Sequence, residues 1–196
     1  MTETTPEVRV MVVDGDAERS RELRGALTLA GYHVVAELKE SLALPDAVRG
    51  LKPHIIIVAA DSPDRDTLEH ISVTIRNAPR PVVMFTQDGA SDSIRAAVKA
   101  GVSAYVVDGL SPERIRSILE VACARFEAHQ ALADRLAETE RQLAERKQVE
   151  KAKGLLMKKR GLSEEAAFKE LRNLAMQTGK TLGEVAQTLI AASHLL

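Results

Sequence analysis

The residues that could do chemistry in the first half of the chain are carboxylates that follow short apolar runs. Asp14, Asp16, Asp61 and Asp108 stand at such places, and Thr86 supplies a hydroxyl in a similar position. Carboxylate oxygens could hold a hard divalent cation or accept a phosphoryl group. The five histidines are scattered, and the sequence has no Ser-His-Asp set, zinc-ligand spacing or phosphate-binding glycine loop. We therefore expect no enzyme, no resident metal and no cofactor.

An alternation of strands and helices positions these side chains. Five β-branched runs predict strands, and four stretches between them carry apolar residues at helical spacing, with Gly31, Gly50 and Gly101 as helix stops. The predicted strands are residues 8–13, 34–37, 55–59, 81–86 and 104–108, and the predicted helices are residues 17–30, 42–51, 66–76 and 91–100. Strands this rich in Val and Ile are buried on both faces, so the pattern predicts an α/β fold with a five-stranded parallel, doubly wound sheet. In such folds a site lies at the carboxyl ends of the strands.

Four segments at those strand ends carry a resemblance to a known family. They are Val12-Val13-Asp14, Ala59-Ala60-Asp61-Ser62-Pro63, Phe85-Thr86 and Gly101 to Tyr105. In order and spacing they resemble the motifs of the receiver domains of two-component response regulators. The resemblance covers residues 1–110 and implies a flavodoxin-like or CheY-like fold.

The resemblance also shows which parts of the receiver chemistry are missing. In that family an aspartate accepts a phosphoryl group, an acidic pair holds magnesium, and a lysine neutralises the new charge. The matching positions hold Ala59, Gly15 after the single surviving acid Asp14, and Asp108 in place of the lysine. Thr86 alone matches the hydroxyl position. These residues predict a pseudo-receiver that takes up no phosphate and is controlled by the docking of another protein.

Two other interpretations of the carboxylates stay open at this point. In one, Asp61 accepts the phosphoryl group while Asp14 and Asp16 hold the metal. In the other, the three aspartates cap helices or are solvated, and Asp16 before Ala17 has the place of an N-cap.

A long helix is predicted after the receiver. Ser111 and Pro112 form a helix start, and no Gly or Pro follows before Lys153. Apolar or small residues recur at the a and d spacing of a coiled coil, namely Ile115, Ala122, His129, Leu136 and Leu143 with Leu119, Phe126 and Ala133 interleaved, while Glu140 and Lys147 interrupt the second series. The pattern favours a homodimer through this stalk, and the alternative is a stalk folded against its own receiver.

Charge is distributed unevenly along the chain. Residues 146–196 hold ten Lys and Arg against five acids, a net charge of +5, which leaves −6 for the rest because the whole chain carries −1. A basic module on an acidic body is typical of a nucleic-acid binder with a separate control domain, although a basic face that is merely solvated would look the same. The polar N-terminus, the single Cys123 and the short apolar runs predict a cytoplasmic protein with no membrane association.

Three short helices are predicted in this basic module. They span 149–159, 163–177 and 181–193, with Ser163 as one N-cap and Thr181 with Glu184 as a capping box. The expected core is Val149, Ala152, Leu155, Leu156, Ala167, Phe168, Leu171, Leu174, Ala175, Leu182, Val185, Ala186, Leu189 and Ile190. Met157 and Met176 are expected to fill gaps in that core.

The same residues carry a second resemblance. The strings Ala152 to Met157, Gly161 to Phe168, Leu171-Arg172, Ala175-Met176 and Leu182 to Ala186 strongly resemble the ANTAR signature, named after the AmiR and NasT transcription antitermination regulators. This resemblance implies binding to paired hairpins in a leader mRNA, so that RNA polymerase reads through a terminator. The degraded receiver looks most like the NasT branch, which implies nitrate and nitrite assimilation genes and a nitrate- or nitrite-sensing protein that controls the regulator. The expected domains are a pseudo-receiver (1–110), a coiled-coil linker (111–148) and an ANTAR RNA-binding domain (149–196).

Candidate RNA contacts follow from residue type and position. The predicted phosphate contacts are Lys151, Lys153, Lys158, Lys159, Arg160, Arg172 and Lys180, with Gln177 and Thr178 as base contacts near a helix end. Gly154 would allow close approach of either RNA or a neighbouring helix. With Phe168 expected in the core, base stacking is not expected. The competing functions are a DNA-binding regulator, which Gly183 and Glu184 in the last helix argue against, and a protein-interaction adaptor.

Overall fold

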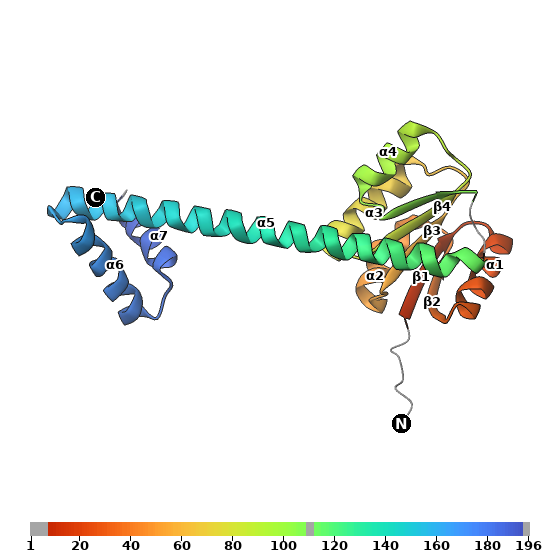
Figure 1. Cartoon of the computed structure of the whole chain (residues 1–196), viewed down its shortest axis with the longest axis horizontal. Coiled ribbons are helices and arrows are strands. Elements are labelled where there is room, and N and C mark those ends of the chain that lie inside the picture. Colours follow the sequence, from red (N-terminus) through yellow and green to blue (C-terminus); the bar gives the residue numbers. More distant parts are fainter. Residues whose placement is uncertain (1–7, 109–111, 194–196) are drawn as a thin grey trace, which may run out of the picture. The chain divides into compact units, whose positions relative to one another are not determined.

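A computed structural model describes residues 8–108 and 112–193, in two compact units that run to Gln130 and from Ala131 (Figure 1). The expected N-cap Ser111 lies outside the described residues. No helix in the described ranges combines the length and apolarity needed to cross a membrane.

The first unit is built on a parallel sheet. Its strands are β1 (Val8–Asp14), β2 (Tyr32–Leu38), β3 (Ile55–Ala59), β4 (Val82–Thr86) and β5 (Ala104–Val107), in the order β2-β1-β3-β4-β5. Strands β3 and β4 are buried along their whole length, as expected for β-branched strands covered on both faces. The predicted doubly wound α/β fold is confirmed.

Helices cover both faces of this sheet (Figure 1). They are α1 (Ala17–Leu29), α2 (Leu44–Leu51) after a short 3-10 turn (Ser41–Ala43), α3 (Arg65–Asn77), α4 (Ser91–Ala100) and the start of α5 (Pro112–Arg160). One face packs against α1 and α5, where Leu23 and Leu119 are fully buried. The other face packs against α2, α3 and α4, where Leu44 and Ile71 are fully buried. Two separate hydrophobic layers therefore hold the sheet.

The helix ends match the sequence signals with one exception. Gly31 and Gly101 follow α1 and α4 with positive φ values of 86° and 99°, as predicted. Gly50 is not a stop, because α2 continues to Leu51 and ends at Lys52 in the left-handed region. The residue that follows is Pro53, and a proline disfavours helical geometry in the residue before it.

The predicted coiled-coil series divides between two environments. Ile115, Leu119 and Ala122 are buried in the receiver core, so the stalk does fold against its own receiver over its first turns. Further along the same helix, Leu136 and Leu143 of the same series are 60% and 53% exposed. The stalk also has no break before residue 149, since α5 continues to Arg160 as the first helix of the second unit.

The second unit packs α6 (Glu164–Thr178) and α7 (Leu182–Ser193) against the end of α5. Its fully packed centre includes Ala152, Ala167 and Ala186, where small side chains let the helices approach closely. Twelve of the expected core residues are buried or half-buried, but Phe168 and Leu174 are 42% and 40% exposed, so placing them in the core was wrong. Short helices bury only a narrow stripe, and both residues lie beside it. The predicted caps are confirmed, with Ser163 Oγ accepting from Ala166 N and the Thr181–Glu184 pair bonding reciprocally.

Candidate functional site

The carboxyl ends of the strands bring the degenerate receiver residues together. Asp14 at the end of β1 pairs in register with Ala59 at the end of β3, and both are 4% exposed. A hollow of about 570 Å³ opens beside them, lined by Gly15 and Ala59 among others. The end of β3 therefore presents a methyl group where a receiver would need an oxygen for phosphoryl transfer.

Arg19 occupies the centre of this cluster. Its Nε and Nη2 donate to the Asp14 carboxylate at 3.0 and 2.7 Å, and its Nη1 pairs with Asp61. Nη2 also lies 3.4 Å from the carbonyl oxygen of Ala59. The Asp14 carboxylate, with a smaller contribution from Asp61, raises the pKa of Arg19 above its ordinary value. One guanidinium thus links the ends of β1 and β3 as a permanent cation.

The other carboxylates have local roles. Asp16 caps α1, where its Oδ1 accepts from the backbone nitrogens of Glu18 and Arg19 at 2.8 and 2.9 Å, and these bonds lower the pKa of Asp16. The capping interpretation of Asp16 is confirmed. Asp108 is exposed after β5 with φ of 50°. Among the residues that the structure describes, no group of three His, Cys, Asp or Glu side chains is close enough to hold a metal ion.

Thr86 has its hydroxyl engaged at the end of β4. The Oγ1 donates to the carbonyl oxygen of Asp61 at 2.9 Å and accepts from the backbone nitrogen of Asp88 at 3.1 Å. It therefore fastens the loop after β3 to the loop after β4. Together with Arg19, this makes the edge of the sheet a self-satisfied network of hydrogen bonds and charges.

Lys153 differs from the other predicted phosphate contacts. Its side chain is 10% exposed, and Nζ lies 2.8 Å from Glu150 and 2.7 Å from Glu164. The hydrogen bond with Glu150, and to a smaller extent that with Glu164, raises the pKa of Lys153 above its ordinary value. The pair with Glu164 links α5 to the start of α6, so the geometry favours a structural role for this cation.

The remaining cations form an exposed group on the second unit. They are Lys151, Lys158, Lys159 and Arg160 on α5, Arg172 on α6 and Lys180 between α6 and α7. Arg160 pairs with Glu170. Within the described ranges, the other five lie beyond ion-pair distance of any carboxylate. An exposed set of unneutralised cations is what a phosphate backbone would bind.

The predicted base contacts lie at the end of α6. Gln177 and Thr178 are exposed, and Thr178 Oγ1 donates to the carbonyl oxygen of Leu174 at 2.7 Å. Phe168 lies on the same helix in a hollow that also contains Arg172, Met176 and Lys180. Met157 and Met176 are 39% and 74% exposed, so they do not fill the core as expected. An exposed aromatic ring near cations can stack on a base, which the sequence had not led us to expect.

Two glycines of this unit have different surroundings. A side chain at Gly154 would meet nothing within 4 Å in the described structure, so no neighbouring helix of the unit requires glycine there. At Gly183 a Cβ atom would lie 2.6 Å from Cγ of Glu145, so α7 approaches α5 closely at this point. The sequence signal for Gly183, a glycine inside an apolar helix, was present but was interpreted only against DNA binding.

Comparison with known proteins finds similar proteins for both units of the chain. The chain matches the ANTAR domain over residues 137–190. It is 30% identical over 182 residues to the transcriptional regulatory protein PdtaR of Mycobacterium tuberculosis, covering 93% of this chain and 89% of that protein. Over 73 residues, 36% of this chain and 18% of the relative, it is 40% identical to the nitrate regulatory protein of Klebsiella oxytoca. A CheY-like receiver from Methanospirillum hungatei shares the fold of the first unit, with a TM-score of 0.55 at 16% identity over 63% of this chain and 98% of that one.

Proposed function

Since this chain belongs to the family of ANTAR-domain response regulators, we propose that it binds folded RNA through its second unit and acts as a transcription antiterminator. The receiver and ANTAR families are regulatory and not enzymatic. The observation that carries the proposal is the exposed cationic group, in which Lys158, Lys159 and Arg172 have no carboxylate partner among the described residues. Phosphates of an RNA stem would neutralise these charges with release of counterions.

The exposed Phe168 supports RNA over a DNA duplex as the ligand. Its ring shares a hollow with Arg172 and Lys180, so a base stacked there would have cations close to its phosphates. Unpaired bases that can stack in this way are offered by hairpin loops and not by an intact duplex.

Paired hairpins would be bound by a homodimer. The exposed Leu136 and Leu143 follow the seven-residue spacing of a coiled-coil seam on α5, and two copies that pair through them would bury these side chains. A dimer carries two ANTAR units, so the second hairpin binds at the high effective concentration set by the first. Stabilising the two-hairpin fold in this way disfavours the terminator, and RNA polymerase reads through without contacting the protein itself.

Control of this activity would come from a docked protein. Ala59 offers no phosphoryl acceptor, and Arg19 already forms ion pairs with Asp14 and Asp61. We propose a nitrate- or nitrite-sensing protein as the partner and nitrate or nitrite assimilation genes as the targets. The 40% identity with the nitrate regulatory protein over 73 residues supports this choice.

The test is equilibrium binding of the full chain to labelled nucleic acids. We expect a two-hairpin leader RNA to bind more tightly than a single hairpin, and a duplex DNA of equal charge to bind more weakly than either. The logarithm of the affinity should fall linearly with the logarithm of the salt concentration. Tighter binding of the DNA duplex, or no binding of any hairpin at low salt, would reject the proposal.

The nitrate assignment has its own test. In a transcription assay with purified polymerase, the chain should raise readthrough of a nitrate-assimilation leader and leave an unrelated terminator unchanged. Addition of the sensor protein without nitrate should abolish the effect, and nitrate should restore it. Equal readthrough of both templates would remove the nitrate assignment while leaving RNA binding intact.

A further inference from the structure

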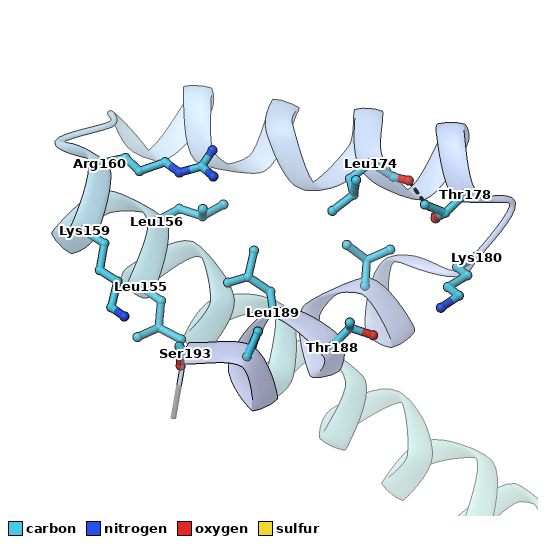
Figure 2. A pocket seen from close by; sticks show the side chains of 12 residues that line it. Leu155, Leu156, Lys159, Arg160, Leu174, Thr178, Lys180, Thr188, Leu189 and Ser193 are labelled. Carbon is cyan, nitrogen blue, oxygen red and sulfur yellow. Dashed lines mark hydrogen bonds between the residues drawn. The ribbon is translucent and has the colours of Figure 1, made fainter. Parts of the chain in front are cut away.

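A cleft of about 490 Å³ opens in the second unit, and its volume is in the range of small-ligand sites. It lies between α6 and α7 and is bounded at one end by the last turns of α5 (Figure 2). Leu174 and Leu189 extend into it from opposite helices (Figure 2). None of the RNA contacts predicted from the sequence depended on such a cleft.

The walls of the cleft are apolar. Leu155 and Leu189 are half-buried and Leu174 is 40% exposed, while Val185 is buried. These leucines leave an apolar slot open to solvent, which costs free energy unless a ligand fills it. Flat apolar faces, such as those of a nucleobase, fit between leucine side chains.

The charged residues at the cleft favour a ligand with negative charge. Lys159 and Arg160 stand at one end and Lys180 at the other, and no acidic residue is among those that line it (Figure 2). Arg160 forms an ion pair with Glu170, so Lys159 and Lys180 are the cations available to a ligand. An apolar slot between two cations fits a flat group carried on an anionic backbone.

The hydroxyl groups in the cleft restrict the chemical class of the ligand further. Thr178, Thr188 and Ser193 donate their protons to the backbone carbonyl oxygens of Leu174, Glu184 and Ile190 at 2.7, 2.8 and 2.7 Å. A hydroxyl whose proton is used in this way still has an oxygen that can accept a hydrogen bond. The cleft therefore offers acceptors to a ligand that carries N–H donors.

From these contacts we propose that the cleft between α6 and α7 binds one unpaired, amino-bearing base of an RNA hairpin loop, with the adjoining phosphates on Lys159 and Lys180. This site rests on the RNA binding proposed above and adds a base-reading contact to it. The leucines hold the faces of the base, and the hydroxyl oxygens accept from its exocyclic amine.

A second copy of the chain is a poorer occupant. Two such clefts facing each other would bring together six cations from Lys159, Arg160 and Lys180, with Glu170, which pairs with Arg160, and Glu184, which lies near Lys180, to offset them in each copy. Like charges at a contact disfavour association. An RNA loop brings the opposite charge.

The experiment combines abasic RNA with a variant that fills the cleft. Each loop base of a bound hairpin is replaced in turn by an abasic sugar, which keeps every phosphate. Besides any base stacked on Phe168, we expect one further position to weaken binding of the wild-type full chain about tenfold, and replacement of that base by its analogue without the amine to weaken it about fivefold. Ala192→Phe, which fills the cleft, should weaken binding of the intact hairpin about tenfold and leave binding of that abasic hairpin unchanged.

Ala191→Phe is the matched control, because Ala191 is exposed on the same helix and does not line the cleft. It should bind both RNAs as the wild type does, and circular dichroism should give the same helix content for both variants. Equal affinity of the wild type for all abasic hairpins would overturn the site while leaving RNA binding in place. This measurement uses the wild-type chain alone, so it does not depend on the folding of a variant. No binding of any hairpin would reject both proposals. A change in sedimentation coefficient caused by Ala192→Phe without RNA would reassign the cleft to a second copy.

Discussion

The receiver cluster around Arg19 and the cations of the ANTAR unit use the same side-chain chemistry in opposite ways. Arg19 has two carboxylates within ion-pair distance and is 26% exposed, whereas Lys158, Lys159 and Lys180 are exposed and, among the described residues, without such a partner. A cation that is paired within the fold contributes to stability, and a cation that has no carboxylate partner is available to bind a ligand. The arrangement of partners, and not the count of charges, distinguishes the two regions.

Arg19→Ala tests whether the paired cation stabilises the fold, and it should have the largest effect. It leaves Asp14 buried without its counter-charge, and removal of one partner from a buried pair costs about 3 kcal/mol in the free energy of unfolding. Arg24→Ala is the control, since its pair with Glu37 is more exposed and such pairs contribute about 0–1 kcal/mol. Chemical denaturation followed by circular dichroism measures both, and adding Asp14→Asn to Arg19→Ala should recover part of the loss. Equal destabilisation by the two arginine variants would contradict the role given to Arg19.

The second is the double variant Lys158→Ala/Lys159→Ala, which tests the open cations. Loss of two phosphate contacts should weaken hairpin binding about 30-fold at low salt and reduce the salt slope by about 2, with no change in Tm. Lys39→Ala/Lys99→Ala removes the same charge from exposed sites of the receiver and should leave affinity almost unchanged. If both double variants lost affinity equally, net charge alone would account for binding.

The third variant, Phe168→Ala, separates base stacking from charge, because it removes an exposed ring without changing the net charge. Stacking on one base contributes about 1–3 kcal/mol, so hairpin affinity should fall about tenfold. The Tm should change little because the ring is 42% exposed, whereas Leu171→Ala, at 1% exposure, should destabilise the unit. Phe168→Trp should retain affinity. A Phe168→Ala variant that unfolds like Leu171→Ala would return this ring to the core.

The smallest expected effect concerns Glu164, which Lys153 pairs within the ANTAR unit. The hydrogen bond from Lys153 lowers the pKa of Glu164, so its contribution to stability is present above the pKa of the unfolded chain and is lost as the pH falls through the lower folded value. Thermal melts between pH 7 and about pH 3 should therefore show a smaller loss of Tm in Glu164→Gln than in the wild type, with the difference appearing below about pH 4.3. Parallel curves would show that this pair contributes nothing.

Local signals in the sequence were sufficient for much of this structure. The alternation of β-branched and helical segments predicted the sheet, and Asp16, Ser163 and Thr181 predicted helix starts, because each cap involves residues within three positions. The end of α2 at Leu51 was predicted as well, but the stop signal was assigned to Gly50 when Pro53 follows the left-handed Lys52 that ends the helix. Features that depend on the distance between neighbouring residues were accessible without coordinates.

Contacts between distant segments were not accessible in this way. Arg19 meets Asp61 across 42 positions, and nothing in the spacing indicates that pair. Phe168 is one position, about 100° of helix rotation, from the buried Ala167, so helical phase placed it near the core and only the packed bundle decided its exposure. The cleft likewise depends on how far Leu174 and Leu189 are held apart, which composition does not specify.

The methyl group of Ala59 has a consequence for timing. A receiver that stores a signal as an acyl phosphate loses it at the rate of hydrolysis, whereas a receiver that ends β3 in a methyl group and takes up no phosphate elsewhere would have no such covalent memory. Its state would follow the free concentration of its partner, and turning 1:99 into 99:1 would require a partner that prefers one state by about 5.5 kcal/mol. The signal would then persist for as long as that partner takes to dissociate.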